Sequence, residues 1–97
     1  MSTVSIGDFS RNGLYQITDT AWDSNGTMRV TVREMIGERE MPKARLEAMR
    51  RFARRALPEY HEGQTRGAAT VRVWYAQGCS HATFAVTRKR AVVTKSV

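Results

Sequence analysis

Two segments near the beginning of the chain alternate between apolar and polar residues. They cover residues 14–22 and 27–35, and the sequence Asp23-Ser24-Asn25-Gly26 separates them. A period of two places every second side chain on the same face of a strand, and Asn-Gly accepts the positive φ angles of a tight hairpin turn. The pattern therefore predicts a β-hairpin over residues 14–35.

Apolar residues recur every three or four positions between Pro42 and Leu57. This spacing gives a helix one apolar stripe, and proline is tolerated in the first helical turn because its missing N–H has no partner there. Pro58 disfavours continuation of the helix. We therefore predict an amphipathic helix over residues 42–57. Its core-facing residues are Leu46, Met49, Phe52, Ala53, Ala56 and Leu57.

A second β-hairpin is predicted after a polar loop. Residues 70–76 and 81–87 are rich in residues that favour strands, and a turn over residues 77–80 contains Gly78. Residues 88–97 either extend the fourth strand or turn back as a short fifth strand, and the sequence leaves both possibilities open.

The predicted order β-β-α-β-β indicates a two-layer α+β domain. We expect an antiparallel sheet of four or five strands with one helix packed on one face, all within a single domain of residues 1–97. Residues 1–12 are expected to be a flexible leader, and residues 88–97 a basic tail or a strand extension. The side chains expected to face the helix are Tyr15, Ile17, Met28, Val30, Val32, Val71, Val73, Tyr75, Phe84 and Val86. Those expected on the opposite face are Gln16, Thr18, Thr20, Arg29, Thr31, Arg33, Arg72, Trp74, Thr83 and Thr87.

Charge is distributed unevenly along this chain of 97 residues. The net charge is +7, with about −1 in residues 1–47 and +8 in residues 48–97. Thirteen of the sixteen basic residues are arginine, whose planar guanidinium binds phosphate and carboxylate in a bidentate manner. The composition therefore predicts a polyanionic partner, either nucleic acid or an acidic protein or ribonucleoprotein surface.

The predicted helix concentrates this charge. Arginines repel one another at a spacing of four residues when only water faces them, so their accumulation favours an anionic partner opposite them. A solvated helix exterior, with Glu47 paired to one arginine, is the alternative. The candidate binding residues are Arg50, Arg51, Arg54 and Arg55, flanked by Lys43 and Arg45 and supported by Arg88, Lys89 and Arg90.

The polar face of the predicted sheet is a second candidate. It carries Arg29, Arg33 and Arg72 around Trp74. Such a face can stack the bases of a single strand or dock on a protein, and it can equally be an ordinary solvated face.

Catalytic and metal-binding signatures are weak. Cys79 is the only cysteine, and Cys79 and His81 lack an identifiable orienting partner. We therefore expect no enzyme activity, no cofactor and no metal. A ribonuclease using Tyr60, His61, Arg66 and His81 is the main enzymatic alternative.

The absence of an apolar run of membrane-spanning or signal-peptide length predicts a cytoplasmic protein with no membrane partner. The leading interpretation is a non-catalytic basic module that engages nucleic acid or a ribonucleoprotein through the arginine-rich helix. The size and predicted order also broadly resemble those of small accessory proteins of phages and mobile elements. That resemblance implies the alternative function, inhibition of a host defence complex by docking on its acidic or nucleic-acid-binding surface. A homodimer formed through the sheet face or a strand edge is a further possibility.

Overall fold

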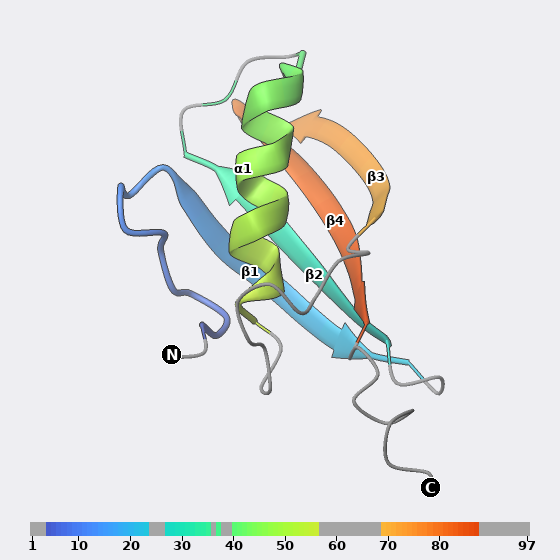
Figure 1. Ribbon diagram of the computed structural model, residues 1–97. Helices are drawn as coiled ribbons and strands as arrows, with labels where there is room; N and C mark the ends of the chain where they lie inside the picture. Colours follow the sequence, from blue (N-terminus) through green and yellow to red (C-terminus); the bar gives the residue numbers. More distant parts are fainter. Residues whose placement is uncertain (1–3, 24–26, 36, 38–39, 57–68, 88–97) are drawn as a thin grey trace, which may run out of the picture.

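The structure is a computed structural model that describes residues 4–23, 27–35, 37, 40–56 and 69–87. One helix and one antiparallel sheet make up these residues, which supports the predicted α+β class (Figure 1). The elements are β1 (Tyr15–Trp22), β2 (Thr27–Glu34), α1 (Lys43–Arg54), β3 (Ala69–Ala76) and β4 (Cys79–Thr87). Residues 88–97, for which an extension or a fifth strand is predicted, lie outside the described part of the chain.

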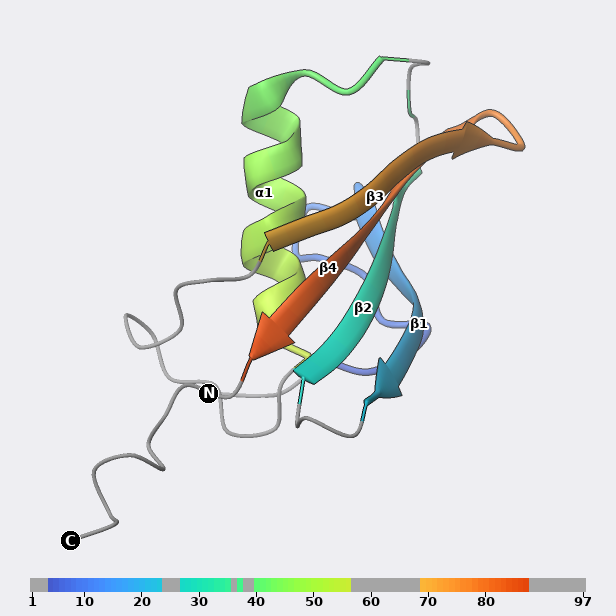
Figure 2. The same ribbon diagram turned by 90° about the vertical axis from the view of Figure 1, so that its right-hand side faces the viewer.

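The strands lie side by side in the order β1-β2-β4-β3 (Figure 2). Each hairpin pairs its own two strands, and β2 pairs with β4 across the connection that contains α1. Because β4 rather than β3 takes the place next to β2, β3 becomes an edge strand. The sequence pattern did not specify this order, since it identifies strands without identifying their neighbours.

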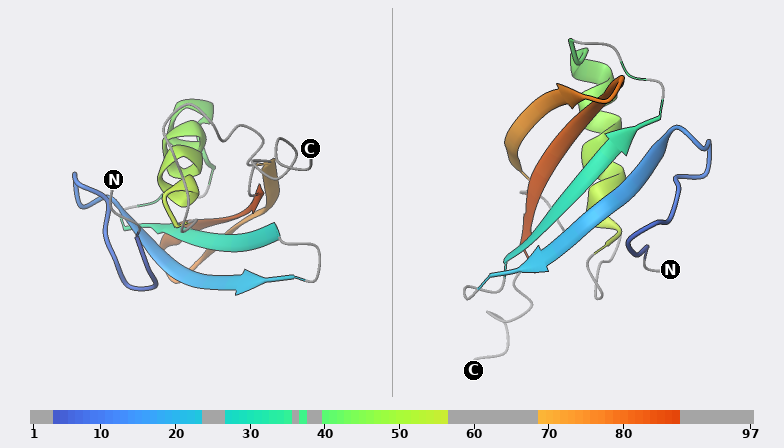
Figure 3. Two further views of the ribbon diagram at one scale, coloured as in Figure 1. Left: turned by 60° about the horizontal axis from the view of Figure 1, so that its bottom comes forward. Right: turned by 180° about the vertical axis from the view of Figure 1, so that it is seen from behind.

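The helix begins after Pro42 and packs against β4, β2 and β1 (Figure 3). Its stripe meets the apolar face of these three strands, and the two layers together bury the core. The buried apolar side chains are Val4, Tyr15, Ile17, Met28, Val30, Val32, Met49, Phe52, Ala53, Ala56, Ala82, Phe84 and Val86. Leu57, the last residue of the predicted stripe, lies outside the described residues.

Three side chains of β3 do not join this core, although the alternation predicted that they would. Val71, Val73 and Tyr75 are 50%, 43% and 37% exposed. The register places Val73 beside Ala82 and Tyr75 beside Ser80, which are on the helix side of the sheet. The predicted face was therefore correct for Val73 and Tyr75, whereas Val71 lies at a register shift between Thr70 and Arg72 that leaves it without a cross-strand partner. The prediction of burial was wrong for all three, because the helix packs over the other three strands.

A β-bulge in β1 changes the face of another predicted residue. The pairing of β1 with β2 shifts between Ile17 and Asp19, so that Thr20 pairs with Val30. Paired residues share a face, and Val30 is buried under the helix. Thr20 consequently lies on the helix side of the sheet, whereas unbroken alternation placed it on the polar face.

The segment predicted as a flexible leader is partly ordered against β1. The N–H of Gly7 donates to the carbonyl of Ile17 at 2.8 Å, and the N–H of Ile17 donates to the carbonyl of Asp8 at 3.0 Å. Phe9 forms an isolated bridge with Gln16, and Val4 is buried in the core. Residues 4–10 therefore cover part of the outer edge of β1, which corrects the prediction for this stretch.

Candidate polyanion interface

The outer side of α1 carries a row of basic side chains. Met49, Phe52 and Ala53 are buried against the sheet. Since successive residues of a helix are about 100° apart, the residues between them point away from the core. The outward set is Lys43, Glu47, Arg50, Arg51 and Arg54, with Arg55 at the C-cap.

These cations differ in how freely they face water. Lys43 and Arg51 are exposed, whereas Arg50, Arg54 and Arg55 are half-buried. Nη1 of Arg50 lies 3.5 Å from Oε2 of Glu47. No carboxylate of the described residues forms an ion pair with Lys43, Arg51, Arg54 or Arg55. Arg51 and Arg54 lie in the last turn, where a positive charge also favours the helix through its dipole.

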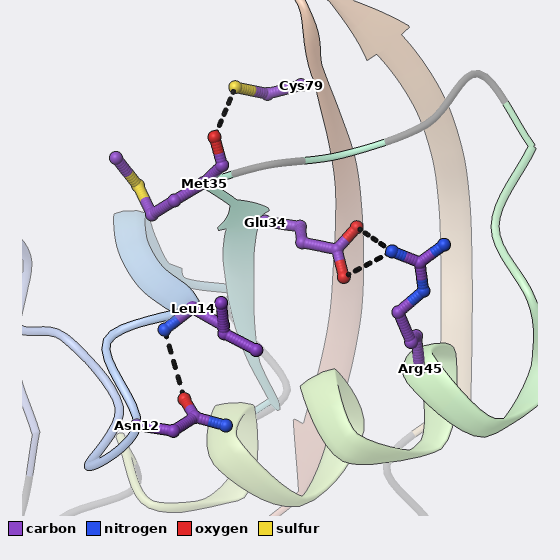
Figure 4. A network of polar contacts seen from close by, with 6 residues as sticks. All are labelled: Asn12, Leu14, Glu34, Met35, Arg45 and Cys79. Atoms are coloured by element: carbon purple, nitrogen blue, oxygen red, sulfur yellow. Dashed lines mark hydrogen bonds and ion pairs between the residues drawn. The ribbon is translucent and has the colours of Figure 1, made fainter.

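Arg45 has a different environment from the other helix cations. Its Nη1 lies 3.3 Å from both carboxylate oxygens of Glu34, and the Glu34 side chain is only 2% exposed (Figure 4). Tyr15 pairs with Glu34 across β1 and β2 and is also buried. Burial and the Glu34 carboxylate raise the pKa of the Tyr15 hydroxyl, against the opposing influence of Arg45 and Arg51. Arg45 is thus positioned to fix the helix to the sheet.

A row of side chains crosses the face of the sheet opposite the helix. The register aligns Gln16, Arg33, His81 and Trp74 on four successive strands. The His81 and Trp74 rings are stacked, with centroids 5.1 Å apart and planes inclined by 11°. The Arg72 guanidinium carbon lies 5.0 Å from the centroid of the Trp74 ring. Trp74 is therefore already in contact with two protein groups, the His81 ring and the Arg72 guanidinium.

The predicted secondary patch does share this face, but the residues do not form one cluster. Arg33 and Trp74 belong to the row described above, and Arg72 pairs with Thr83 in the next row. Arg29 pairs with Ala85 and lies four residues from Arg33 along β2, which corresponds to about 13 Å. The face therefore presents separated cations around one partly covered aromatic ring.

His81 was considered from the sequence only as a catalytic candidate, and its position beside Trp74 was not predicted. The predicted turn covered residues 77–80, whereas the structure turns through Gln77 and Gly78 alone, with φ of 55° and 76°. A two-residue turn of this kind aligns Trp74 with His81. The glycine at position 78 was the available signal, since such turns favour glycine at a position that needs positive φ.

The imidazole of His81 is buried and its pKa is lowered. Desolvation is the largest cause, and the positive charge of Arg33 lowers the pKa further, while a contact of 3.2 Å between Nδ1 and the Cys79 carbonyl opposes both. A proton then binds the unfolded chain more readily than the folded one in the pH range just below the ordinary histidine pKa of about 6.5. This difference in proton binding between the folded and unfolded chain makes stability depend on pH.

We therefore expect stability to decrease as the pH falls from about 6.5 through the lower pKa of the folded state. Thermal unfolding followed by circular dichroism between neutral and mildly acidic pH measures this slope. His81→Gln should flatten the slope, and His61→Gln, at the other histidine, serves as the control. An equal slope in the wild type and in His81→Gln would contradict the assignment.

The described residues show no arrangement that brings the catalytic candidates together. The Cys79 thiol donates to the Met35 carbonyl at 3.5 Å, as Figure 4 shows, and the His81 ring is stacked on Trp74. Tyr60, His61 and Arg66 of the ribonuclease hypothesis lie outside the described residues, as do the supporting cations Arg88, Lys89 and Arg90. Within the described ranges, no three His, Cys, Asp or Glu side chains are grouped so that they could hold a metal ion.

No helix formed by the described residues has the length and apolar character needed to cross a lipid bilayer. Comparison of the chain with protein-family models, with curated proteins and with solved structures finds no match.

Proposed function

We propose that this protein is a non-catalytic binding module that engages a polyanion, either nucleic acid or a ribonucleoprotein, through the outer side of α1. One observation carries the proposal. Lys43, Arg51, Arg54 and Arg55 have no carboxylate partner among the described residues, and Glu47 is paired with Arg50. Bringing these like charges together is unfavourable in water, and an anionic ligand removes that cost.

Phosphate groups suit this surface better than scattered carboxylates do. Basic residues on two successive turns of a helix repeat about every 5.4 Å, so neighbouring side chains can contact separate phosphates of one backbone. Each neutralised phosphate releases condensed counterions, which makes the affinity depend strongly on salt. The outer sheet face supports the proposal less, because its cations are separated and Trp74 is occupied by His81 and Arg72.

Charge reversal at Arg51 tests the proposal. Arg51 is exposed and forms no ion pair with another described residue, so Arg51→Glu should fold normally and weaken binding to single- or double-stranded nucleic acid by about tenfold. The measurement is fluorescence anisotropy with labelled DNA and RNA at several salt concentrations. Arg51→Gln should reduce the slope of log K against log salt by about 1 if Arg51 contacts one phosphate.

Arg29→Glu is the matched control. It changes the net charge by the same amount, from an exposed position on the opposite face of the sheet. We expect it to weaken binding by no more than about threefold through the general field of the protein. Equal losses in the two variants would show that net charge rather than α1 determines binding. Absence of nucleic-acid binding even at low salt would contradict the proposal and favour the alternative, docking on an acidic protein surface.

A further inference from the structure

The two outer edges of the sheet differ in a way that points to a second interaction. The edge of β1 is covered in part by residues 4–10, which donate and accept hydrogen bonds along it. No strand of the described residues pairs with the outer edge of β3, which Figure 2 shows at the near side of the sheet. Exposed edges of this kind are templates for pairing with another strand.

The side chains of β3 increase this tendency. Val71 and Val73 are half-exposed on an edge strand that contains no proline and only one charged residue, Arg72. Natural edge strands are normally protected by charges, proline or a covering element. Apart from Arg72, β3 has none of these protections, and no described segment covers its outer edge. Exposed apolar side chains commonly mark an interaction surface.

The turn between β3 and β4 determines which backbone N–H and C=O groups of β3 point toward β4 and which point toward the outer edge. A two-residue turn makes the flanking pair, Ala76 and Cys79, a hydrogen-bonded pair, and such pairs alternate along an antiparallel ladder. The backbones of Trp74 and His81 consequently form a hydrogen-bonded pair, whereas the N–H and C=O of Val73 point away from β4. The edge therefore presents a donor and an acceptor at Val73.

The residues on either side of Val73, Arg72 and Trp74, are of complementary chemistry. The register shift between Thr70 and Arg72 ends the regular part of β3 at Arg72. When two copies of residues 72–74 pair antiparallel around a two-fold axis at Val73, Val73 lies opposite Val73 of the other copy. Arg72 then lies opposite the other copy's Trp74, on the same face of the sheet. Arg72 already lies over Trp74 within its own strand, so the same cation–π contact is chemically suited to the pairing.

We propose that the protein forms a homodimer by antiparallel pairing of β3 with β3 of a second copy, centred on Val73. A two-fold interface requires a surface that is complementary to itself, and this strand meets that requirement with apolar residues on one face and Arg–Trp pairs on the other. The dimer has one continuous sheet of at least eight strands. Both copies of α1 lie on the same side, and the proposed polyanion surface is doubled.

Net charge opposes this association. Each copy carries +7, so the copies repel one another at low salt, and the contact is short. Interfaces of this size are typically weak, on the order of micromolar affinity. Salt screens the repulsion and should therefore strengthen the dimer, whereas it weakens polyanion binding. The two proposals thus respond to salt in opposite directions and can fail separately.

Sedimentation velocity of nuclease-treated protein, over a range of protein and salt concentrations, tests the dimer. We expect a monomer–dimer equilibrium that shifts toward dimer as salt rises. Val73→Lys should weaken dimerisation at least tenfold because it places two positive charges face to face at the two-fold axis. Ile6→Lys, which changes another exposed aliphatic residue, is the matched control and should behave as wild type.

Hydrogen exchange at the Val73 amide gives an independent readout. The protection of this amide should rise with protein concentration in the wild type. In Val73→Lys, the neighbouring amides of β3 should show no such rise. A protein that stays monomeric at every concentration, or a dimer insensitive to Val73→Lys, would overturn the proposal. So would a Val73 amide that is protected in the monomer, since another segment of the same chain would then cover the edge. Arg51→Glu should leave dimerisation unimpaired.

Discussion

Arg45→Met is expected to lower the free energy of unfolding by about 2 to 3 kcal/mol, because it leaves the Glu34 carboxylate buried without its partner. Glu34 is 2% exposed, and Arg45 is its hydrogen-bonding partner in the described structure. Loss of one member of a fully buried pair commonly costs 3 to 5 kcal/mol. The expectation here is smaller because Arg45 is 31% exposed and a single nitrogen contacts both oxygens, which is not the stronger two-nitrogen arrangement.

Urea denaturation followed by circular dichroism measures this loss. The double variant Glu34→Leu with Arg45→Met should recover most of the stability, since an apolar pair of similar volume removes the buried charge together with its partner. Arg51→Met provides a control at an exposed helix position and should change stability by no more than about 0.5 kcal/mol. A double variant as unstable as Arg45→Met would show that the ion pair is not the cause.

Measuring polyanion binding by the Arg45→Met variant separates structural from binding roles among the predicted helix cations. Arg45 was grouped with the candidate binding residues because its sequence position is close to theirs, yet its guanidinium contacts a buried carboxylate. If Arg45 acts mainly through the fold, the folded fraction of Arg45→Met should bind polyanions about as tightly as wild type. An affinity loss as large as that of Arg51→Glu would assign Arg45 to the interface as well.

Gly37→Ala is expected to destabilise the protein by about 1 to 3 kcal/mol, because a methyl group has no room there. A Cβ at position 37 would lie 2.8 Å from Oγ of Ser80 and closer still to its backbone nitrogen. Ser80 is 2% exposed, pairs with Tyr75 of β3 and precedes His81, where β4 is paired on both sides, so its backbone cannot move away easily. The substitution therefore forces the backbone at position 37 away from the sheet.

Gly13→Ala is the control for this substitution. Position 13 has open space around it but a φ of +77°, so its cost comes from backbone conformation alone and should be about 1 kcal/mol. Thermal and urea denaturation compare the two variants. We also expect Gly37→Ala to increase hydrogen exchange at Ser80, which Gly13→Ala should leave unchanged. Equal and small losses in both variants would contradict a close contact between Gly37 and β4.

The positions of the helix and strands could be predicted because each depends on local chemistry. Alternation and an Asn-Gly turn indicate the first hairpin, and the three- and four-residue spacing of apolar residues indicates the helix. The structure shows this helix over Lys43–Arg54, inside the predicted range of 42–57, with Pro42 and Arg55 as its caps. The sequence also separated Met49 and Phe52 from Arg50 and Arg51, since the period of a helix alone assigns them to opposite sides. That separation is the basis of the candidate interface.

Tertiary structure decided what lies next to what. The order β1-β2-β4-β3 made β3 an edge, and the placement of α1 over the other three strands left Val73 exposed. The bulge in β1 places Thr20 on the helix side of the sheet. The two-residue turn at Gly78 sets the register that stacks His81 on Trp74. Arg45 pairs with the buried Glu34 carboxylate and therefore differs from the other basic residues of the helix. The sequence by itself determined local periodicity and charge, because these depend on neighbours in the chain. Only the folded chain determined burial, pairing and free edges, because these depend on residues distant in sequence.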